Sequence, residues 1–187
     1  MMPPDNAVVL SVDEKPSIQA LERAQGYLKL PNGRAMTGQS HDYKRHGTTT
    51  LFAALEVATG KWSAATIAGA GALDFMNRIV AAYPDRELHV ILDNLSTHKP
   101  RRDQWLARHR NVHFHYTPTH GSWLNQIEVW FSILAGRSLK GASFASRSDL
   151  IAHIDSFIAD YNEHADPFVW TKSAVHQTTL KPCFAVQ

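Results

Sequence analysis

The chain has 187 residues, of which 44% are hydrophobic, so its length suggests one domain with a sizeable core. Lys and Arg outnumber Asp and Glu by only two, 19 against 17, so the overall charge is weak evidence for a nucleic-acid partner. A single cysteine, Cys183, excludes an internal disulfide and favours a reduced, cytoplasmic setting, and no apolar run approaches the ~18 residues of a membrane span.

The first part of the chain predicts strands separated by a long loop. Residues 6–14, NAVVLSVDE, are a short β-branched run that ends in acid, which is typical of a strand. Residues 14–47 contain scattered Pro, Gly, Asn and Ser and are predicted to be mostly loop, longer than a compact domain usually holds without a use for it. Residues 48–68 then predict two strands around a turn at Thr59-Gly60.

The second part predicts alternating helices and strands. The expected helices cover residues 71–84, 96–110, 122–136 and 146–164, with Ser122 as an N-cap, and the expected strands cover residues 87–94 and 111–118. The order is strand, two strands, helix, strand, helix, strand, helix, helix. This order predicts an α/β fold of one domain, residues 1–187, with a mixed sheet and helices on both of its faces.

Two aspartates follow buried strands. Asp13 ends the run VVLSVD and Asp93 ends the run HVILD. In open α/β sheets functional groups gather at the carboxyl ends of strands, so both carboxylates would emerge side by side if the two strands are neighbours. An aspartate that forms a turn or caps a helix remains the alternative for each of them.

A third carboxylate lies on the helix expected over residues 122–136. Trp123, Leu124, Ile127, Phe131 and Leu134 share one face at helical spacing, which favours core packing over stacking on unpaired bases. Trp130, on the flank of that face, is left open. Glu128 lies at the margin of the face, where we expect it to look across the sheet edge, although an ordinary exposed glutamate is the alternative.

Three converging acids without a buried Lys or Arg suit hard divalent cations, which prefer oxygen ligands. Two Mg²⁺ ions could then clamp the attacking and leaving oxygens of a phosphodiester. A zinc site at His113 and His115, which share one face of a strand, is the weaker option because no further ligand has suitable spacing. His120 fits a phosphate contact or a loop contact better than a metal.

Five sequence blocks carry a family resemblance. In chain order they are DEKPSIQALER, HDYKRHGTTTLFAALEVATG, LDNLSTHK, PTHGSWLNQIEVWFS and YNEHADPFVWT. Together with Asp13, Asp93 and Glu128, with 34 residues between the last two, they resemble the catalytic domain of mariner-related bacterial insertion-sequence transposases, from about Val8 to Lys172.

The resemblance implies an RNase H-like fold and strand cleavage and strand transfer at transposon ends, dependent on two Mg²⁺ or Mn²⁺ ions held by Asp13, Asp93 and Glu128. It implies DNA, both transposon ends and target, as the partner, and therefore association with the nucleoid; whether the chain acts as a homodimer is left open. No small-molecule cofactor and no membrane are expected. Candidate DNA contacts beside the acids or in basic patches are Lys44, Arg45, His98, Lys99, Arg101, Arg102, His120 and Trp123.

The chain departs from the family in starting almost on the first catalytic strand, so we expect the N-terminal helix-turn-helix modules to be absent. Without them, binding to DNA is expected to be weak and without sequence preference. Two other readings stay open. One is a non-catalytic transposase fragment that binds DNA or regulates, and the other is a stand-alone RNase H-like nuclease.

Overall fold

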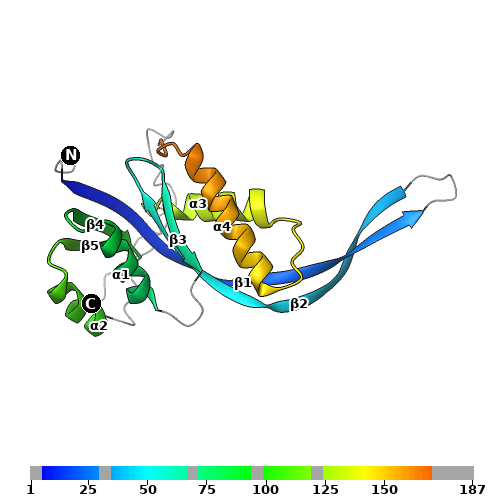
Figure 1. Ribbon diagram of the computed structural model, residues 1–187, viewed down its shortest axis with the longest axis horizontal. Coiled ribbons are helices and arrows are strands. Elements are labelled where there is room, and N and C mark those ends of the chain that lie inside the picture. Colours follow the sequence, from blue (N-terminus) through cyan, green and yellow to red (C-terminus); the bar gives the residue numbers. More distant parts are fainter. Residues whose placement is uncertain (1–5, 30–34, 67–70, 94–98, 119–123, 170–187) are drawn as a thin grey trace, which may run out of the picture.

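The structure is a computed structural model, and it describes residues 6–29, 35–66, 71–93, 99–118 and 124–169. Its centre is a five-stranded sheet in the order β3-β2-β1-β4-β5 (Figure 1). The first three strands pair antiparallel, whereas β1 with β4 and β4 with β5 pair in parallel. The strands are β1 Ala7–Lys29, β2 Ala35–Glu56, β3 Trp62–Thr66, β4 Glu87–Leu92 and β5 Val112–Tyr116. The predicted mixed sheet and the predicted order of elements are confirmed.

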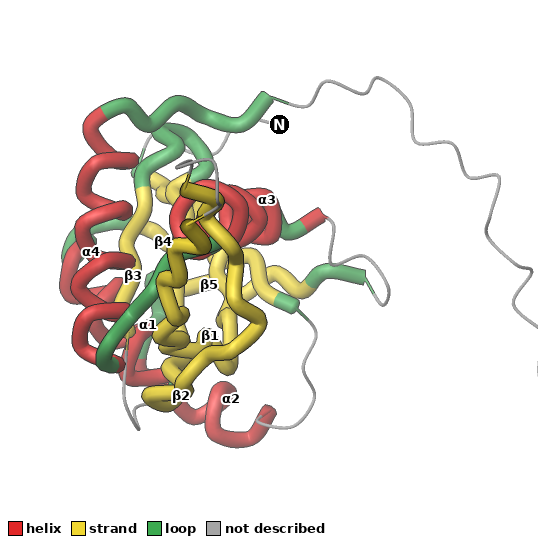
Figure 2. Tube along the Cα trace, turned by 90° about the vertical axis from the view of Figure 1, so that its right-hand side faces the viewer, coloured by secondary structure: helices red, strands yellow, loops and turns green. Residues whose placement is uncertain are grey.

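Helices cover both faces of this sheet, as predicted. Alternate residues of the central strands point to opposite faces, so each face has its own core. On one face Leu10 of β1 and Val90 of β4 pack with α1 (Ala72–Ala82) and with Trp105 of α2 (Lys99–Arg108). On the other, Leu51 and Leu55 of β2 pack with α3 (Ile127–Ile133), its π-helical continuation η3 (Leu134–Leu139) and α4 (Arg147–Glu163). Figure 2 shows the sheet between α3 and α2.

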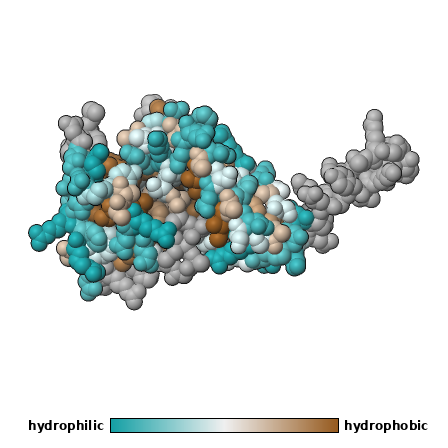
Figure 3. All heavy atoms as spheres, in the orientation of Figure 1, coloured by the Kyte–Doolittle hydropathy of each residue, from teal (hydrophilic) through white to brown (hydrophobic). Residues whose placement is uncertain are grey.

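The surface fits this layered arrangement. On the face drawn in Figure 3 the described residues are mostly hydrophilic, interrupted by small apolar patches. Within the described residues, no helix is long and apolar enough to cross a membrane.

The predicted long loop over residues 14–47 is wrong. β1 continues to Lys29 and β2 begins at Ala35, and the two strands stay paired out to Lys29 with Ala35, forming a long ribbon that projects from the sheet (Figure 1). The Pro and Gly content indicated a loop, but a β-bulge accommodates Pro16, and Gly26 and Gly38 pair with each other within the ribbon. Pro16 falls in a register shift between Lys15 and Ile18, beside Ser17 with φ 57°.

The base of the ribbon is anchored to the helical layer. The N–H of Phe144 donates to the carbonyl of Leu21 at 2.9 Å, and the N–H of Arg23 donates to Ser143 Oγ at 2.9 Å. Ile18 and Ala20 belong to the core under α4. The ribbon is therefore part of the folded body up to about Arg23.

Shortening the ribbon beyond this base is expected to leave stability nearly unchanged. Replacing residues 25–39 by Asn-Gly, a two-residue hairpin turn, removes no described core residue, and a two-stranded ribbon alone adds little stability. Calorimetry should find the melting temperature within about 4 °C of the parent, equivalent to about 1 kcal/mol or less. A drop several times larger would mean that the outer ribbon packs on the body.

The helix expected over residues 122–136 is shorter and its apolar face is only partly confirmed. α3 begins at Ile127 after Gln126, while Ser122 and Trp123 lie outside the described residues. Ile127, Phe131 and Leu134 are buried as predicted, and Trp130 is fully buried too. Leu124 is exposed, against expectation, because it precedes the helix.

Candidate active site

Asp13 lies on β1, two residues beyond Ser11, the last residue of β1 that pairs with β4. Its carboxylate Oδ1 accepts a hydrogen bond from the N–H of Glu14 at 2.8 Å. The pKa of this carboxyl is raised to about 6, chiefly by burial, and the negative charges of Asp93, Glu128 and Glu14 contribute to the rise, while the hydrogen bond from the Glu14 N–H opposes it. Both other acids therefore lie close enough to Asp13 to repel it.

Asp93 follows β4 directly and lies beside Asp13. The parallel register pairs Ser11 with Ile91, so the two aspartates each come two residues after a paired position on strands that run about 4.8 Å apart. Thr117, buried after β5, donates from Oγ1 to Asp93 Oδ1 at 2.9 Å and from its backbone N–H to the Leu92 carbonyl at 3.0 Å. Thr117 thereby holds the Asp93 carboxylate at the carboxyl end of the sheet.

Glu128 lies in the first turn of α3, which packs over β1 and β2. Its side chain is exposed, so the expectation that it is turned away from bulk water is wrong. Its negative charge nevertheless contributes to the raised pKa of the Asp13 carboxyl.

Beside the aspartates lies a pocket of about 110 Å³. Asp13, Glu14 and Asp93 line it together with apolar side chains of the sheet and α1, namely Val12, Phe52, Ala72, Leu73, Phe75, Met76, Leu92 and Phe114. A concave, mostly apolar site that contains an acid with a perturbed pKa, here Asp13, has the properties expected of an active site.

The donor set fits a hard divalent cation in its chemistry. All three side chains offer carboxylate oxygens, and within the described part of the chain none of them has a Lys or Arg partner. Among the described residues, however, no three His, Cys, Asp or Glu side chains stand in an arrangement that could hold a metal ion. A metal ion shared by all three would therefore require the carboxylates to move closer together.

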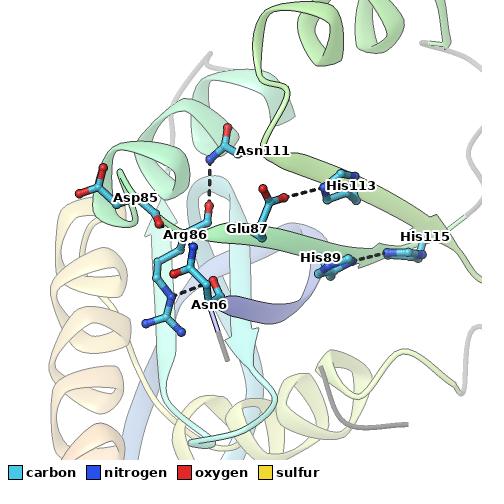
Figure 4. Close-up of polar contacts among 8 residues, drawn as sticks. All are labelled: Asn6, Asp85, Arg86, Glu87, His89, Asn111, His113 and His115. Carbon is cyan, nitrogen blue, oxygen red and sulfur yellow. Dashed lines mark hydrogen bonds and ion pairs between the residues drawn. The ribbon is translucent and has the colours of Figure 1, made fainter. Parts of the chain in front are cut away.

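The histidines on β4 and β5 make hydrogen bonds with a glutamate or with each other. His113 Nε2 lies 2.7 Å from Glu87 Oε2, and His115 Nε2 lies 2.9 Å from His89 Nδ1 (Figure 4). Partial burial lowers the pKa of His115, and the neighbouring His89 and His113 lower it further. Among the described residues these histidines belong to no set of three His, Cys, Asp or Glu side chains that could hold a metal ion, so the weaker zinc hypothesis gains no support.

The predicted DNA contacts fall in different places. Lys44 and Arg45 are exposed on the ribbon, paired with Glu22 and Leu21, about 26–30 Å along β1 from Asp13 at ~3.3 Å per residue. The structure therefore does not bring them to the acids. Lys99, Arg101 and Arg102 lie in the first turn of α2 with side chains outside the described part, and His98, His120 and Trp123 lie outside the described residues.

Sequence reasoning missed three polar residues that hold the site together, Ser11, Thr117 and Asn125. Ser11 and Asn125 are fully buried and hydrogen bonded to each other. One signal was present for Ser11, which interrupts the otherwise apolar run VVLSV. Thr117 and Asn125 follow from the strand order and the placement of α3, which no local pattern contains.

Comparison with known proteins places this geometry in context. The sequence profile of the DDE superfamily endonucleases matches residues 8–151. The fold is similar to the Mos1 transposase paired-end complex with left transposon end, with a TM-score of 0.55 and 17% identity over 81% of this chain and 47% of that chain. It is also similar to the Mos1 strand transfer complex, with a TM-score of 0.52 and 14% identity over 84% and 49% of the two chains.

A third similar structure is the Mos1 mariner paired end complex with Mn, with a TM-score of 0.51 and 15% identity over 85% and 49% of the two chains. These likenesses confirm the predicted RNase H-like fold. The chain spans about half the length of the solved chains that it matches. No curated protein matches it.

Proposed function

The chain belongs to the DDE superfamily endonucleases, whose profile covers more than half of it, and from this premise we propose that it is the catalytic domain of a mariner-related transposase. The proposed reaction is cleavage of a DNA strand followed by transfer of the freed 3′ end to target DNA. The observation that carries the proposal is that Asp13 and Asp93 occupy matching positions on neighbouring parallel strands, and that the charges of Asp93 and of Glu128 on α3 both raise the pKa of Asp13.

In this proposal Asp13, Asp93 and Glu128 hold two Mg²⁺ or Mn²⁺ ions. Bound there, the ions would activate the attacking oxygen and stabilise the leaving oxygen of a phosphodiester. The chain's own groups orient the ligands: the Glu14 N–H holds Asp13, and the Thr117 hydroxyl holds Asp93. The exposed Glu128 is the member with most freedom to move toward the other two.

DNA is the proposed substrate and partner. The Mos1 structures that share this fold are named for complexes with a transposon end and for strand transfer, and one is named for Mn, which support the proposal by analogy of fold. The exposed Lys44 and Arg45 on the ribbon are proposed to contact phosphates. We propose the same role for His98, Lys99, Arg101, Arg102, His120 and Trp123.

A plasmid-nicking assay tests the function. Supercoiled DNA incubated with the chain and Mn²⁺ should be converted to the open circle, and EDTA should stop the reaction. Asp93→Asn should be inactive, whereas Asp155→Asn, an exposed aspartate on α4, should nick as the parent does. Binding without nicking would favour a non-catalytic DNA-binding fragment, and cutting only of an RNA–DNA hybrid would favour a ribonuclease.

Binding to DNA is expected to depend on salt and not on sequence. Phosphate contacts release counterions, so the dissociation constant should lie at roughly 10⁻⁴–10⁻⁶ M near physiological salt. Lys44→Ala with Arg45→Ala should reduce the slope of log K against log salt by about two. Fluorescence anisotropy with two unrelated duplexes measures both effects, and Lys61→Ala with Lys140→Ala, two exposed lysines elsewhere, is the control. A preference of more than about a hundredfold for one duplex would contradict the expectation, since non-specific binding carries no sequence information.

A further inference from the structure

A buried polar bridge joins β1 to the start of α3. Ser11 on β1 and Asn125 before α3 are both 0% exposed. Ser11 Oγ donates to Asn125 Oδ1, and Asn125 Nδ2 donates to the Val12 carbonyl at 3.2 Å. The N–H of Ile127 donates to Ser11 Oγ at 3.4 Å.

This bridge connects the neighbours of two of the three acids. Val12, whose carbonyl Asn125 binds, directly precedes Asp13. The carbonyl of Asn125 in turn accepts the N–H of Glu128 at 3.1 Å. A single side chain therefore links the backbone beside Asp13 to the backbone of Glu128.

The bridge consists of hydrogen bonds, whereas α3 otherwise contacts the sheet through apolar side chains. α3 lies on β1 and β2 through Ile127 and Phe131, and apolar packing of this kind is not directional, so it holds a helix on a sheet without fixing its axial position closely. Hydrogen bonds are directional in both distance and angle. A buried Ser and Asn are unfavourable unless satisfied, and apolar residues of similar size could fill the same space.

We propose that Asn125, together with Ser11, is a positioning pair that fixes Glu128 relative to Asp13. The pair contacts neither substrate nor metal and acts through the start of α3. This inference rests on the proposed function, in which the carboxylates of Glu128 and Asp13 share the same ions.

The chain contains a matched control for this pair. Asn162 on α4 makes an equivalent helix-to-strand bridge, since its Nδ2 donates to the Trp62 carbonyl at 2.9 Å and its Oδ1 accepts the Trp62 N–H at 2.8 Å. It joins α4 to β3, the edge strand separated from β4 by β2 and β1. Removing Asn162 breaks as many side-chain bonds of the same residue type away from the acids.

The experiment compares Asn125→Ala and Ser11→Ala with Asn162→Ala. Mn²⁺ affinity is measured by electron paramagnetic resonance, and single-turnover nicking is measured at saturating Mn²⁺, both corrected for the folded fraction. Asn125→Ala should weaken Mn²⁺ binding about 10- to 100-fold, as loss of an orienting partner does. It should also lower the maximal single-turnover rate constant and leave the concentration needed for half the maximal rate unchanged. Asn162→Ala should change neither value per folded molecule, although it also lowers stability.

A metal-free measurement separates this proposal from the proposed function. Hydrogen exchange at the amides of Ile127 and Glu128 should accelerate in Asn125→Ala and Ser11→Ala and stay unchanged in Asn162→Ala. Ser11→Ala changes little volume, so it keeps the test open if Asn125→Ala does not fold. A parent chain that neither binds Mn²⁺ nor nicks DNA would refute the proposed function even if the amides loosen. Variants of the pair that bind Mn²⁺ and nick like the parent, or like Asn162→Ala, would overturn the positioning role.

Discussion

Replacing Asp13 by asparagine is expected to lower DNA nicking by about a thousandfold, since a bound metal ion supplies several kcal/mol of transition-state stabilisation. Asparagine keeps the shape of the side chain and an oxygen that can accept the Glu14 N–H. It lacks the negative charge that a hard cation requires. The nicking assay with Mn²⁺ measures the loss, and substantial activity in the variant would remove Asp13 from the proposed ligand set.

The same substitution is expected to raise stability at neutral pH. The folded-state pKa of Asp13 is about 6 against an ordinary 3.8, so the folded chain holds this proton more tightly than the unfolded chain does. Stability from this group is therefore present below pH 3.8 and is lost as the pH rises through about 6. At pH 7.5 Asp13→Asn should gain about 1–2 kcal/mol, less than the full shift because the carboxyl is only partly buried.

Denaturant unfolding of the parent and the variant across pH checks this gain. The difference should disappear near pH 4, where the parent carboxyl is protonated in the folded state. Added Mn²⁺ should raise the melting temperature of the parent more than that of Asp13→Asn, because ligand binding stabilises the folded state. Asp155→Asn, on the exposed face of α4, should show neither effect. A variant less stable than the parent at pH 7.5 would mean that burial and the neighbouring charges do not destabilise the Asp13 carboxylate.

The sheet was predictable because its strands follow local rules. VVLSV and HVIL are apolar runs that end in acid, and their parallel neighbourhood brings Asp13 and Asp93 together. Glu128 was predicted as a site residue from the family resemblance and from its place beside Ile127, Phe131 and Leu134, which repeat at helical spacing and are buried. In each case the signal lies within a few residues of the side chain concerned.

The ribbon and the polar bridge could not be predicted in the same way. Pro16 and the glycines of residues 14–47 suggest a loop locally, and the segment is extended only because β1 and β2 pair as a hairpin, with partners from 6 positions (Lys29 and Ala35) to 36 positions (Lys15 and Leu51) apart. Asn125 is an ordinary helix-start residue until α3 is placed over Ser11, which lies 114 positions earlier in the sequence. The ribbon depends on the pairing of two successive strands, and the bridge depends on a contact between segments far apart in the chain.

Trp130 was left open by the sequence, and the structure places it in the core. It is 0% exposed, and its ring stacks on Trp62 of β3 with centroids 4.3 Å apart and planes inclined by 21°. Tyr161 of α4 and Phe168, which follows this helix, contact the Trp62 ring edge-on. Such a buried ring has no face available for stacking on a nucleic-acid base.

Replacing Trp130 by alanine is therefore expected to cost about 3–5 kcal/mol of folding free energy, through lost burial and the cavity that remains. Trp130→Phe should cost less, since Trp130 Nε1 has no hydrogen-bond partner among the described residues and only volume is lost. Val129→Ala, on the exposed side of the same helix, should change stability by less than about 0.5 kcal/mol. Urea unfolding of the three variants gives these differences. If Trp130→Ala instead kept the parent's stability and lost affinity for single-stranded DNA, the ring would be a nucleic-acid contact, and α3 would have to leave the sheet to expose it.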